Sequence, residues 1–182
     1  LTNMVEELLE FSKIEDGRFT LRVEQMDLQA EVEDAIYTYR ELFRQDGIDL
    51  EYSNAGEMFE QPITGDPERL KQVFCNVLDN AVKYTGRGGT VQVSLLRQGP
   101  RALLRVEDNG PGIPEEDLPR VFQRFYRVDK ARSRAAGGTG LGLSIVSDTV
   151  KRRGGQVVAA NRPEGGAVFT VSWPLPEGGS EA

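Results

Sequence analysis

Apolar residues between Asp66 and Thr85 recur three and four positions apart, which is the spacing of one face of an α-helix. These positions are Leu70, Val73, Phe74, Val77, Leu78 and Ala81. Asp66 is a suitable N-cap, and Pro67 suits the first turn because a backbone N–H there has no partner within a helix. The pattern therefore predicts a helix that begins at Pro67 and buries one face.

The rest of the chain combines two further helical patterns with strand-like segments. Asp27 precedes a helical pattern that continues to about Arg44, and another runs from about Leu141 to Arg153, before Gly154-Gly155. Strands are predicted at residues 19–24, 48–53, 90–98, 102–108, 156–161 and 167–175. Helices and antiparallel hairpins in one unit predict an α+β two-layer sandwich, with a mixed, mostly antiparallel sheet covered on one face by helices.

Residues 1–17 differ from the rest of the chain. Their apolar residues step three, four and three positions, as in a coiled-coil seam: Leu1, Met4, Leu8 and Phe11. An isolated helix of this length is marginal in water, so we expect half of a helical hairpin or bundle. Docking of this helix on its own domain is the alternative. Because the chain begins with leucine and not methionine, we expect it to be part of a longer protein.

Composition narrows the class of protein. The 182 residues are 38% hydrophobic and 28% charged, and no apolar run reaches the roughly 20 residues of a membrane span. No secretory signal opens the chain. A net charge of −7 opposes general nucleic-acid binding. The chain has one cysteine, Cys75, and no histidine, which excludes an internal disulfide, a Cys–His nucleophile and a Cys/His zinc site.

Two groups of residues suit a polyphosphate ligand. Asn76, Asn80 and Lys83 form a polar stripe beside the apolar face of the first helix, although asparagine is a mediocre helix former. Neutral amide oxygens can bind Mg²⁺, which normally keeps waters and phosphate oxygens as its other ligands, and the lysine adds a cation. Between Arg120 and Arg134, six basic residues accompany one acid; this run either contacts phosphate or forms an ordinary solvated face.

Two glycine-rich segments carry further candidate chemistry. Residues 108–113, Asp-Asn-Gly-Pro-Gly-Ile, follow a predicted strand. They form either a plain turn or a site where the carboxylate of Asp108 accepts an exocyclic amine and the glycines let a flat base approach the backbone. Residues 137–143, GGTGLGL, open a predicted helix, where backbone N–H groups can bind an anion; a flexible linker is the alternative. This segment lacks the preceding strand of a dinucleotide fingerprint and the Gly-Lys-Ser/Thr of a P-loop.

Four motifs together resemble those of a known family. In this order and spacing, the chain contains N-x-x-x-N-A-x-K-Y, D-N-G-x-G-I, F-x-x-F-Y-R and G-T-G-L-G-L. These motifs resemble the N, G1, F and G2 boxes of sensor histidine kinases of two-component systems. The resemblance covers essentially the whole chain. It implies that residues 1–17 are the C-terminal part of a dimerisation and phosphoacceptor helix, and that residues 18–182 are a catalytic ATP-binding domain with the Bergerat-type fold of the GHKL superfamily.

The resemblance also implies roles for individual residues. Asn76 and Asn80 would hold Mg²⁺, with Asn76, Lys83 and Arg127 acting at the phosphates. ATP would contact Tyr84, Asp108, Gly110, Gly112, Ile113, Phe122, Tyr126, Gly138, Thr139, Gly140, Leu141 and Gly142. Among these, Asp108 would bind the adenine amine, and the Gly138–Gly142 amides would face the phosphates. Phe122, Phe125 and Tyr126 would anchor a mobile lid; plain core packing is the alternative, and the two interpretations overlap because a lid must be attached to the core.

The implied function is ATP·Mg²⁺ binding and transfer of the γ-phosphoryl group to a histidine. That histidine must lie outside this chain, which has none. The implied partners are the phosphoacceptor hairpin of the parent kinase, a second copy in a homodimer, and a response regulator, but neither nucleic acid nor inserted membrane. The implied location is the cytoplasmic side of a membrane-anchored bacterial sensor.

Three rival functions remain open. The first is an ATPase of the gyrase, Hsp90 or mismatch-repair type, which resembles this chain but carries a glutamate where Asn76 stands. The second is a serine kinase that regulates sigma factors, against which residues 1–17 argue. The third is an interaction module that keeps the fold and has lost the nucleotide; the presence of all four boxes argues against it.

Overall fold

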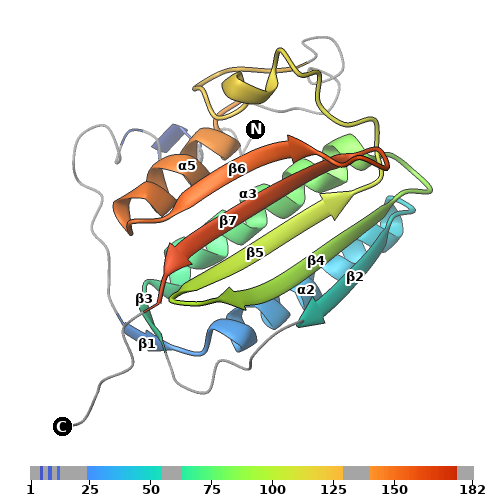
Figure 1. Ribbon diagram of the computed structural model, residues 1–182. Coiled ribbons are helices and arrows are strands. Elements are labelled where there is room, and N and C mark those ends of the chain that lie inside the picture. Colours follow the sequence, from blue (N-terminus) through green and yellow to red (C-terminus); the bar gives the residue numbers. More distant parts are fainter. Residues whose placement is uncertain are drawn as a thin grey trace, which may run out of the picture.

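A sheet with helices on one face forms the body of the molecule (Figure 1). The computed structural model describes residues 24–54, 63–128 and 140–175, together with Val5, Leu8, Leu9 and Ser12. The five strands lie in the order β2 (Asp49–Asn54), β4 (Thr90–Gln98), β5 (Arg101–Asp108), β7 (Ala167–Pro174) and β6 (Gln156–Asn161). β2 and β4 are parallel, and the other three neighbouring pairs are antiparallel, so the predicted mixed, mostly antiparallel sheet is confirmed.

The three longer helices begin within one residue of the predicted positions, and two of them have a capping side chain. α2 (Leu28–Gln45) is capped by Asp27, whose Oδ1 accepts a hydrogen bond from the Ala30 N–H at 3.1 Å. α3 (Pro67–Thr85) is capped by Asp66, which accepts from the N–H groups of two first-turn residues. α5 spans Gly142–Arg152 and ends before two glycines. These caps satisfy helix N–H groups that otherwise lack partners.

The core lies between the sheet and the helices. Strands β4 and β5 alternate buried and less buried residues, as expected when one face of a sheet packs on helices. Residues that are at most 2% exposed come from α2, α3, β4, β5, α5 and β7, and include Phe43, Phe74, Val77, Val91, Val93, Leu95, Leu104, Val106, Ile145, Val146 and Val171. Burying each such side chain stabilises the fold by about 1.5–3 kcal/mol before the entropy cost. This burial fixes α3 against the sheet and leaves its polar flank at the edge of the core.

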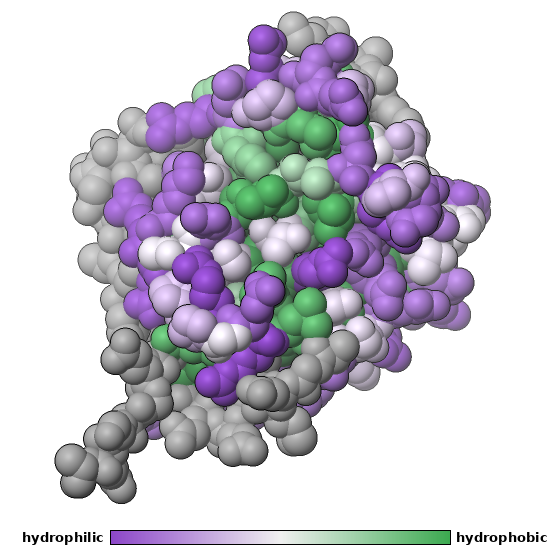
Figure 2. All heavy atoms as spheres, viewed as in Figure 1, coloured by the Kyte–Doolittle hydropathy of each residue, from purple (hydrophilic) through white to green (hydrophobic). Residues whose placement is uncertain are grey.

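The opposite face of the sheet is open (Figure 2). A band of apolar side chains runs through it between polar residues. Val158 on β6 is 53% exposed, while Leu96 and Leu103, which are register partners on β4 and β5, are half-buried. The helices of the described ranges 24–54, 63–128 and 140–175 therefore cover one face of the sheet, as the sequence predicts.

Four features differ from the sequence expectations or extend them. Of the strand predicted at residues 19–24, residues 19–23 lie outside the described part, and Glu24 begins β1 (Glu24–Met26), in which Met26 is buried. β1 pairs with β3 (Ile63–Gly65), which is too short for a periodic pattern to reveal. A short 3₁₀ helix, η1 (Leu118–Arg120), interrupts the predicted loop.

The fourth feature concerns the N-terminal segment. The residues described there are helical and exposed: Val5, Leu8, Leu9 and Ser12. Of the predicted seam, Leu1, Met4 and Phe11 lie outside the described part. The division into residues 1–17 and 18–182 stays a prediction. None of the described helices is long and apolar enough to cross a membrane.

Candidate functional site

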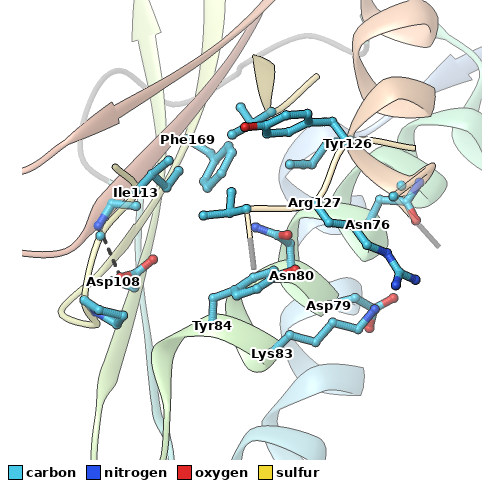
Figure 3. Close-up of a pocket in the computed structure, with 18 of the residues that line it drawn as sticks. Asn76, Asp79, Asn80, Lys83, Tyr84, Asp108, Ile113, Tyr126, Arg127 and Phe169 are labelled. Atoms are coloured by element: carbon cyan, nitrogen blue, oxygen red, sulfur yellow. Dashed lines mark hydrogen bonds between the residues drawn. The ribbon is translucent and has the colours of Figure 1, made fainter. Parts of the chain in front are cut away.

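A cavity of about 490 Å³ lies between α3, the segments that follow β5, and the start of α5 (Figure 3). Its volume falls in the usual range of small-molecule sites. Its lining comprises Asn76, Asp79, Asn80, Lys83, Tyr84, Asp108, Pro111, Gly112, Ile113, Pro114, Val121, Tyr126, Arg127, Val128, Gly140, Gly142, Leu143, Ala167 and Phe169. Parts of all four sequence motifs therefore meet at one cavity.

Most of the predicted site residues that the structure describes line this cavity. They are Asn76, Asn80, Lys83, Tyr84, Asp108, Gly112, Ile113, Tyr126, Arg127, Gly140 and Gly142. Gly110, Phe122 and Leu141 do not belong to the lining. Gly138 and Thr139, and the predicted lid from about Lys130 to Gly138, lie outside the described residues.

Helix α3 supplies the polar wall of the cavity. Residues three and four apart share one face of a helix, so Asn76, Asn80 and Lys83 point to the same side. A Cβ added to Gly142 would lie 3.8 Å from the Asn76 Oδ1, which places the start of α5 directly beside this amide. Arg127 reaches the same end of the cavity from the segment after η1 (Figure 3). This end combines amide oxygens with two cations and suits a metal-bound polyphosphate.

Asp108 lies at the other end of the cavity and is 7% exposed. Its Oδ1 accepts hydrogen bonds from the N–H groups of Gly110, at 2.9 Å, and Ala167, at 3.2 Å. Gly110 is therefore a backbone donor that orients the carboxylate, which explains its absence from the cavity wall. Since both bonds hold the same oxygen, the carboxylate has a fixed orientation toward a ligand.

Asn161 at the end of β6 holds the loop that follows Asp108. Its Oδ1 accepts from the Ile113 N–H at 2.8 Å, and its Nδ2 donates to the Ile113 carbonyl at 2.6 Å. Gly112 adopts φ +77°, and a Cβ there would come within 2.9 Å of the Asn161 Oδ1. The next residue, Arg162, donates from Nη1 to the Asp108 carbonyl at 3.0 Å. Sequence reasoning missed both residues because Asn-Arg-Pro-Glu-Gly-Gly has the composition of an ordinary turn.

The aromatic residues of the third motif have different roles in the structure. Phe122 packs edge-on against Phe169, with ring centroids 6.3 Å apart, so the core-packing alternative describes it best. Phe125 is 58% exposed and adopts φ +61°; its N–H donates to the Gly140 carbonyl at 3.0 Å. Tyr126 lines the cavity and donates its hydroxyl hydrogen to Asp117, which raises the pKa of the phenol. Leu141 is fully buried beneath the start of α5.

Asp79 is a cavity residue that the sequence analysis did not single out. The buried Tyr39 of α2 donates its hydroxyl hydrogen to the Asp79 Oδ1 at 2.8 Å and lies 3.2 Å from the Cys75 carbonyl oxygen. Burial, followed by the Asp79 charge, raises the pKa of Tyr39, so the phenol stays a neutral donor. The sequence signal that could have identified Asp79 is its position between Asn76 and Asn80, since residues 76, 79, 80 and 83 share one helical face.

Comparison with known proteins places this cavity in a family. Residues 65–177 match the model of the family described as histidine kinase-, DNA gyrase B-, and HSP90-like ATPase. The chain is 35% identical over 175 residues to the signal transduction histidine-protein kinase BaeS of Escherichia coli K12, which covers 96% of this chain and 37% of BaeS. The first three curated relatives are matched over 23–37% of their length.

Solved structures show the same relationship. The histidine kinase AdeS of Acinetobacter baumannii matches with a TM-score of 0.75 and 26% identity, over 97% of this chain and 79% of that one. Full-length ShkA in complex with AMPPNP matches with a TM-score of 0.81 and 26% identity, over 95% of this chain and 35% of that one. The family match contains every residue that lines the cavity. The chain belongs to the family of histidine kinase-, DNA gyrase B- and HSP90-like ATPases.

Proposed function

We propose that the chain binds ATP with Mg²⁺ in this cavity and transfers the γ-phosphoryl group to a histidine that lies outside it, in two-component signal transduction. The observation that carries this proposal is one cavity with a buried carboxylate at one end and an amide-and-cation stripe at the other. Curated relatives that match nearly the whole chain are named histidine kinases, and the matching ShkA structure holds an ATP analogue.

The Asp108 end is suited to the adenine base. A carboxylate with little exposure and a fixed orientation accepts a hydrogen bond strongly, and the exocyclic amine of adenine is a matching donor. Apolar side chains of Ile113, Val121 and Phe169 flank the cavity and can enclose the faces of a flat ring. This end would therefore select an amino-substituted base.

The α3 end is suited to the phosphates and the metal. Among the described residues, no group of three or more His, Cys, Asp or Glu side chains is placed to hold a metal ion. The donor set fits Mg²⁺ nevertheless, because Asn76 and Asn80 offer hard oxygens and the phosphates of a nucleotide supply the remaining ones. Bound Mg²⁺ would neutralise charge on the phosphates during transfer.

The chain's own contribution is positioning and charge neutralisation. Lys83 and Arg127 can orient the terminal phosphates toward an acceptor, and the acceptor imidazole itself is the nucleophile, so no strong base is needed here. Water needs a general base to attack efficiently. The ATPases of the gyrase, Hsp90 and mismatch-repair type carry a glutamate where Asn76 stands, and the Asp79 carboxylate at this end already accepts a hydrogen bond from the Tyr39 hydroxyl. Transfer to histidine is therefore favoured over hydrolysis, which counts against the ATPase alternative.

The proposed partners follow from the missing half of the reaction. The chain has no histidine, so the acceptor must come from another segment or chain, for which a dimerisation hairpin of the parent protein is our proposal. Homodimerisation of the parent and transfer to a response regulator complete that scheme. The roles assigned to Asn76, Asn80, Lys83, Arg127 and Asp108 belong to the same proposal.

Labelled ATP tests this function directly. The chain is incubated alone, with a separately produced hairpin of the parent protein that carries the histidine, and with that hairpin after His→Gln substitution. We expect acid-labile label on the intact hairpin only, rising with hairpin concentration. Acid-labile label on the chain alone would contradict the proposal. Absence of label on the intact hairpin, with ATP binding established by a fluorescent analogue, would contradict it as well.

A further inference from the structure

The charges that line the cavity are unevenly placed. Among the described lining residues, the formal charges belong to Asp79, Lys83, Asp108 and Arg127. Asp108 lies at one end, whereas Asp79 lies beside Lys83 and Arg127 at the other (Figure 3). A carboxylate thus stands at the end that the proposed function assigns to phosphates, where an anion opposes an anionic ligand. By itself, this carboxylate would weaken the binding of a polyphosphate at the α3 end.

The position of this carboxylate is held from α2. Tyr39 is 8% exposed, its ring packs edge-on against Phe43 with centroids 6.3 Å apart, and its hydroxyl donates to the Asp79 Oδ1 at 2.8 Å. Lys83 follows Asp79 by four residues on α3, an order of charges that stabilises a helix. Asp79 is therefore oriented by a buried donor, whereas an ordinary surface carboxylate is free to rotate.

Charge is what separates Asp79 from its neighbours. Asn76 and Asn80 offer amide oxygens without formal charge, so they respond weakly to the charge of the ligand. A carboxylate attracts a divalent cation placed between it and the phosphates, and it repels a polyphosphate that arrives without one. Its effect therefore has opposite signs for the two forms of the nucleotide.

We propose that Asp79 makes this site prefer the Mg²⁺-bound nucleotide to the metal-free nucleotide, with Tyr39 as the positioning residue of its carboxylate. The inference rests on the proposed function, since it needs a nucleotide with its phosphates at the α3 end. The proposed function assigns residues that bind the nucleotide. This inference assigns one more residue, Asp79, which distinguishes the Mg²⁺-bound nucleotide from the metal-free nucleotide. A purely structural bond between α2 and α3 would change stability and leave this preference unaltered.

Calorimetric titration with ADP tests the inference without any measurement of activity. Each variant is titrated once with excess Mg²⁺ and once with EDTA. The dissociation constant of ADP in EDTA, divided by that in Mg²⁺, measures the metal preference. We expect Asp79→Asn to lower this ratio about three- to tenfold, with tighter binding of metal-free ADP, and the effect to shrink at 1 M salt. Asp79→Ser removes the same charge with a smaller side chain and should act likewise if Asp79→Asn fails to fold.

Matched variants isolate the role of each residue. Asp34→Asn removes a charge from an exposed position on α2, outside the cavity lining, and should leave the ratio unchanged. Tyr39→Phe should lower the ratio about twofold because the carboxylate loses its donor. Tyr37→Phe changes an 82%-exposed tyrosine on the same helix and should have no effect.

Two failures are distinguishable. Absence of ADP binding to the unsubstituted chain, with and without Mg²⁺, would overturn the proposed function and the inference with it. An unchanged ratio in Asp79→Asn or Asp79→Ser, in a folded variant that still binds ADP, would overturn the inference alone.

Discussion

The two ends of the cavity are built in different ways. At the Asp108 end, backbone groups of β5, β7 and the loop at residues 109–114 are joined by hydrogen bonds through the side chains of Asp108, Asn161 and Arg162. At the α3 end, the wall consists of side chains that project from one helix, together with Arg127. Backbone geometry sets the shape of the Asp108 end, and charged side chains set the electrostatic potential of the α3 end. Selectivity for the base should thus depend on fit, and phosphate binding on electrostatics.

The largest expected effect comes from breaking the backbone fit at Gly166. This residue adopts φ +95°, and a Cβ there would lie 1.9 Å from the Asp108 carbonyl oxygen. Gly165 has a similar φ of +101° with nothing within 4 Å of an added Cβ, so Gly165→Ala is the matched control for strain alone. We expect Gly166→Ala to lower the free energy of unfolding by roughly 2–3 kcal/mol more than the control, as measured in urea. Equal losses in both variants would show that the close approach to the Asp108 carbonyl oxygen adds nothing to the cost of backbone strain.

Asp108→Asn should have the next largest effect, and it should weaken nucleotide binding more than it lowers the stability of the fold. The Asn Oδ1 can still accept from Gly110 and Ala167, but an amide N–H replaces the other oxygen and opposes the amine of adenine. Loss of a hydrogen bond to a charged group in a desolvated site costs roughly 1.5–3 kcal/mol, so ADP should bind at least about tenfold more weakly. Titration that shows unchanged ADP affinity would exclude Asp108 from the base site.

Asn161→Ala should have a moderate effect at the same end. It removes two hydrogen bonds to Ile113, each worth about 0.5–1.5 kcal/mol net, and leaves the loop less fixed. We expect weaker ADP binding by several-fold and faster hydrogen exchange at the Ile113 amide. Asn161→Asp keeps the acceptor for the Ile113 N–H and loses the donor to its carbonyl, so an intermediate loss should follow. An Asp variant as impaired as Ala would indicate that the donor carries the effect.

The smallest effect is expected at the α3 end, from Lys83→Gln. Removal of one cation should weaken ATP binding about threefold at 0.1 M salt and hardly at all at 1 M, because exposed charges are screened. Lys71→Gln, an exposed position on the same helix outside the lining, is the control. A loss that persists at 1 M salt would show that Lys83 acts through a specific hydrogen bond, and the contrast between the two ends would weaken.

The parts that could be predicted from sequence are those set by local periodicity. The helical repeat places residues 76, 80 and 83 on one face whatever surrounds the helix, and the caps at Asp27 and Asp66 depend on neighbours two or three residues away. The strand-like segments likewise predicted the central strands, β4 and β5, which alternate buried and less buried residues. The strand predicted at residues 19–24 stays a prediction over residues 19–23, which lie outside the described part, and three-residue strands such as β3 are too short for alternation to locate.

Only the tertiary structure decided which distant residues support the site. Tyr39 meets Asp79 across 40 residues and Asn161 meets Ile113 across 48, and no local pattern links positions so far apart. Phe122 could equally face a ligand or Phe169 by its sequence, and packing placed it in the core. The sequence by itself determined the chemistry of each motif, because side-chain type and helical spacing are local properties. The packing of the sheet against the helices decided which motifs meet at the cavity and which polar side chains hold them there.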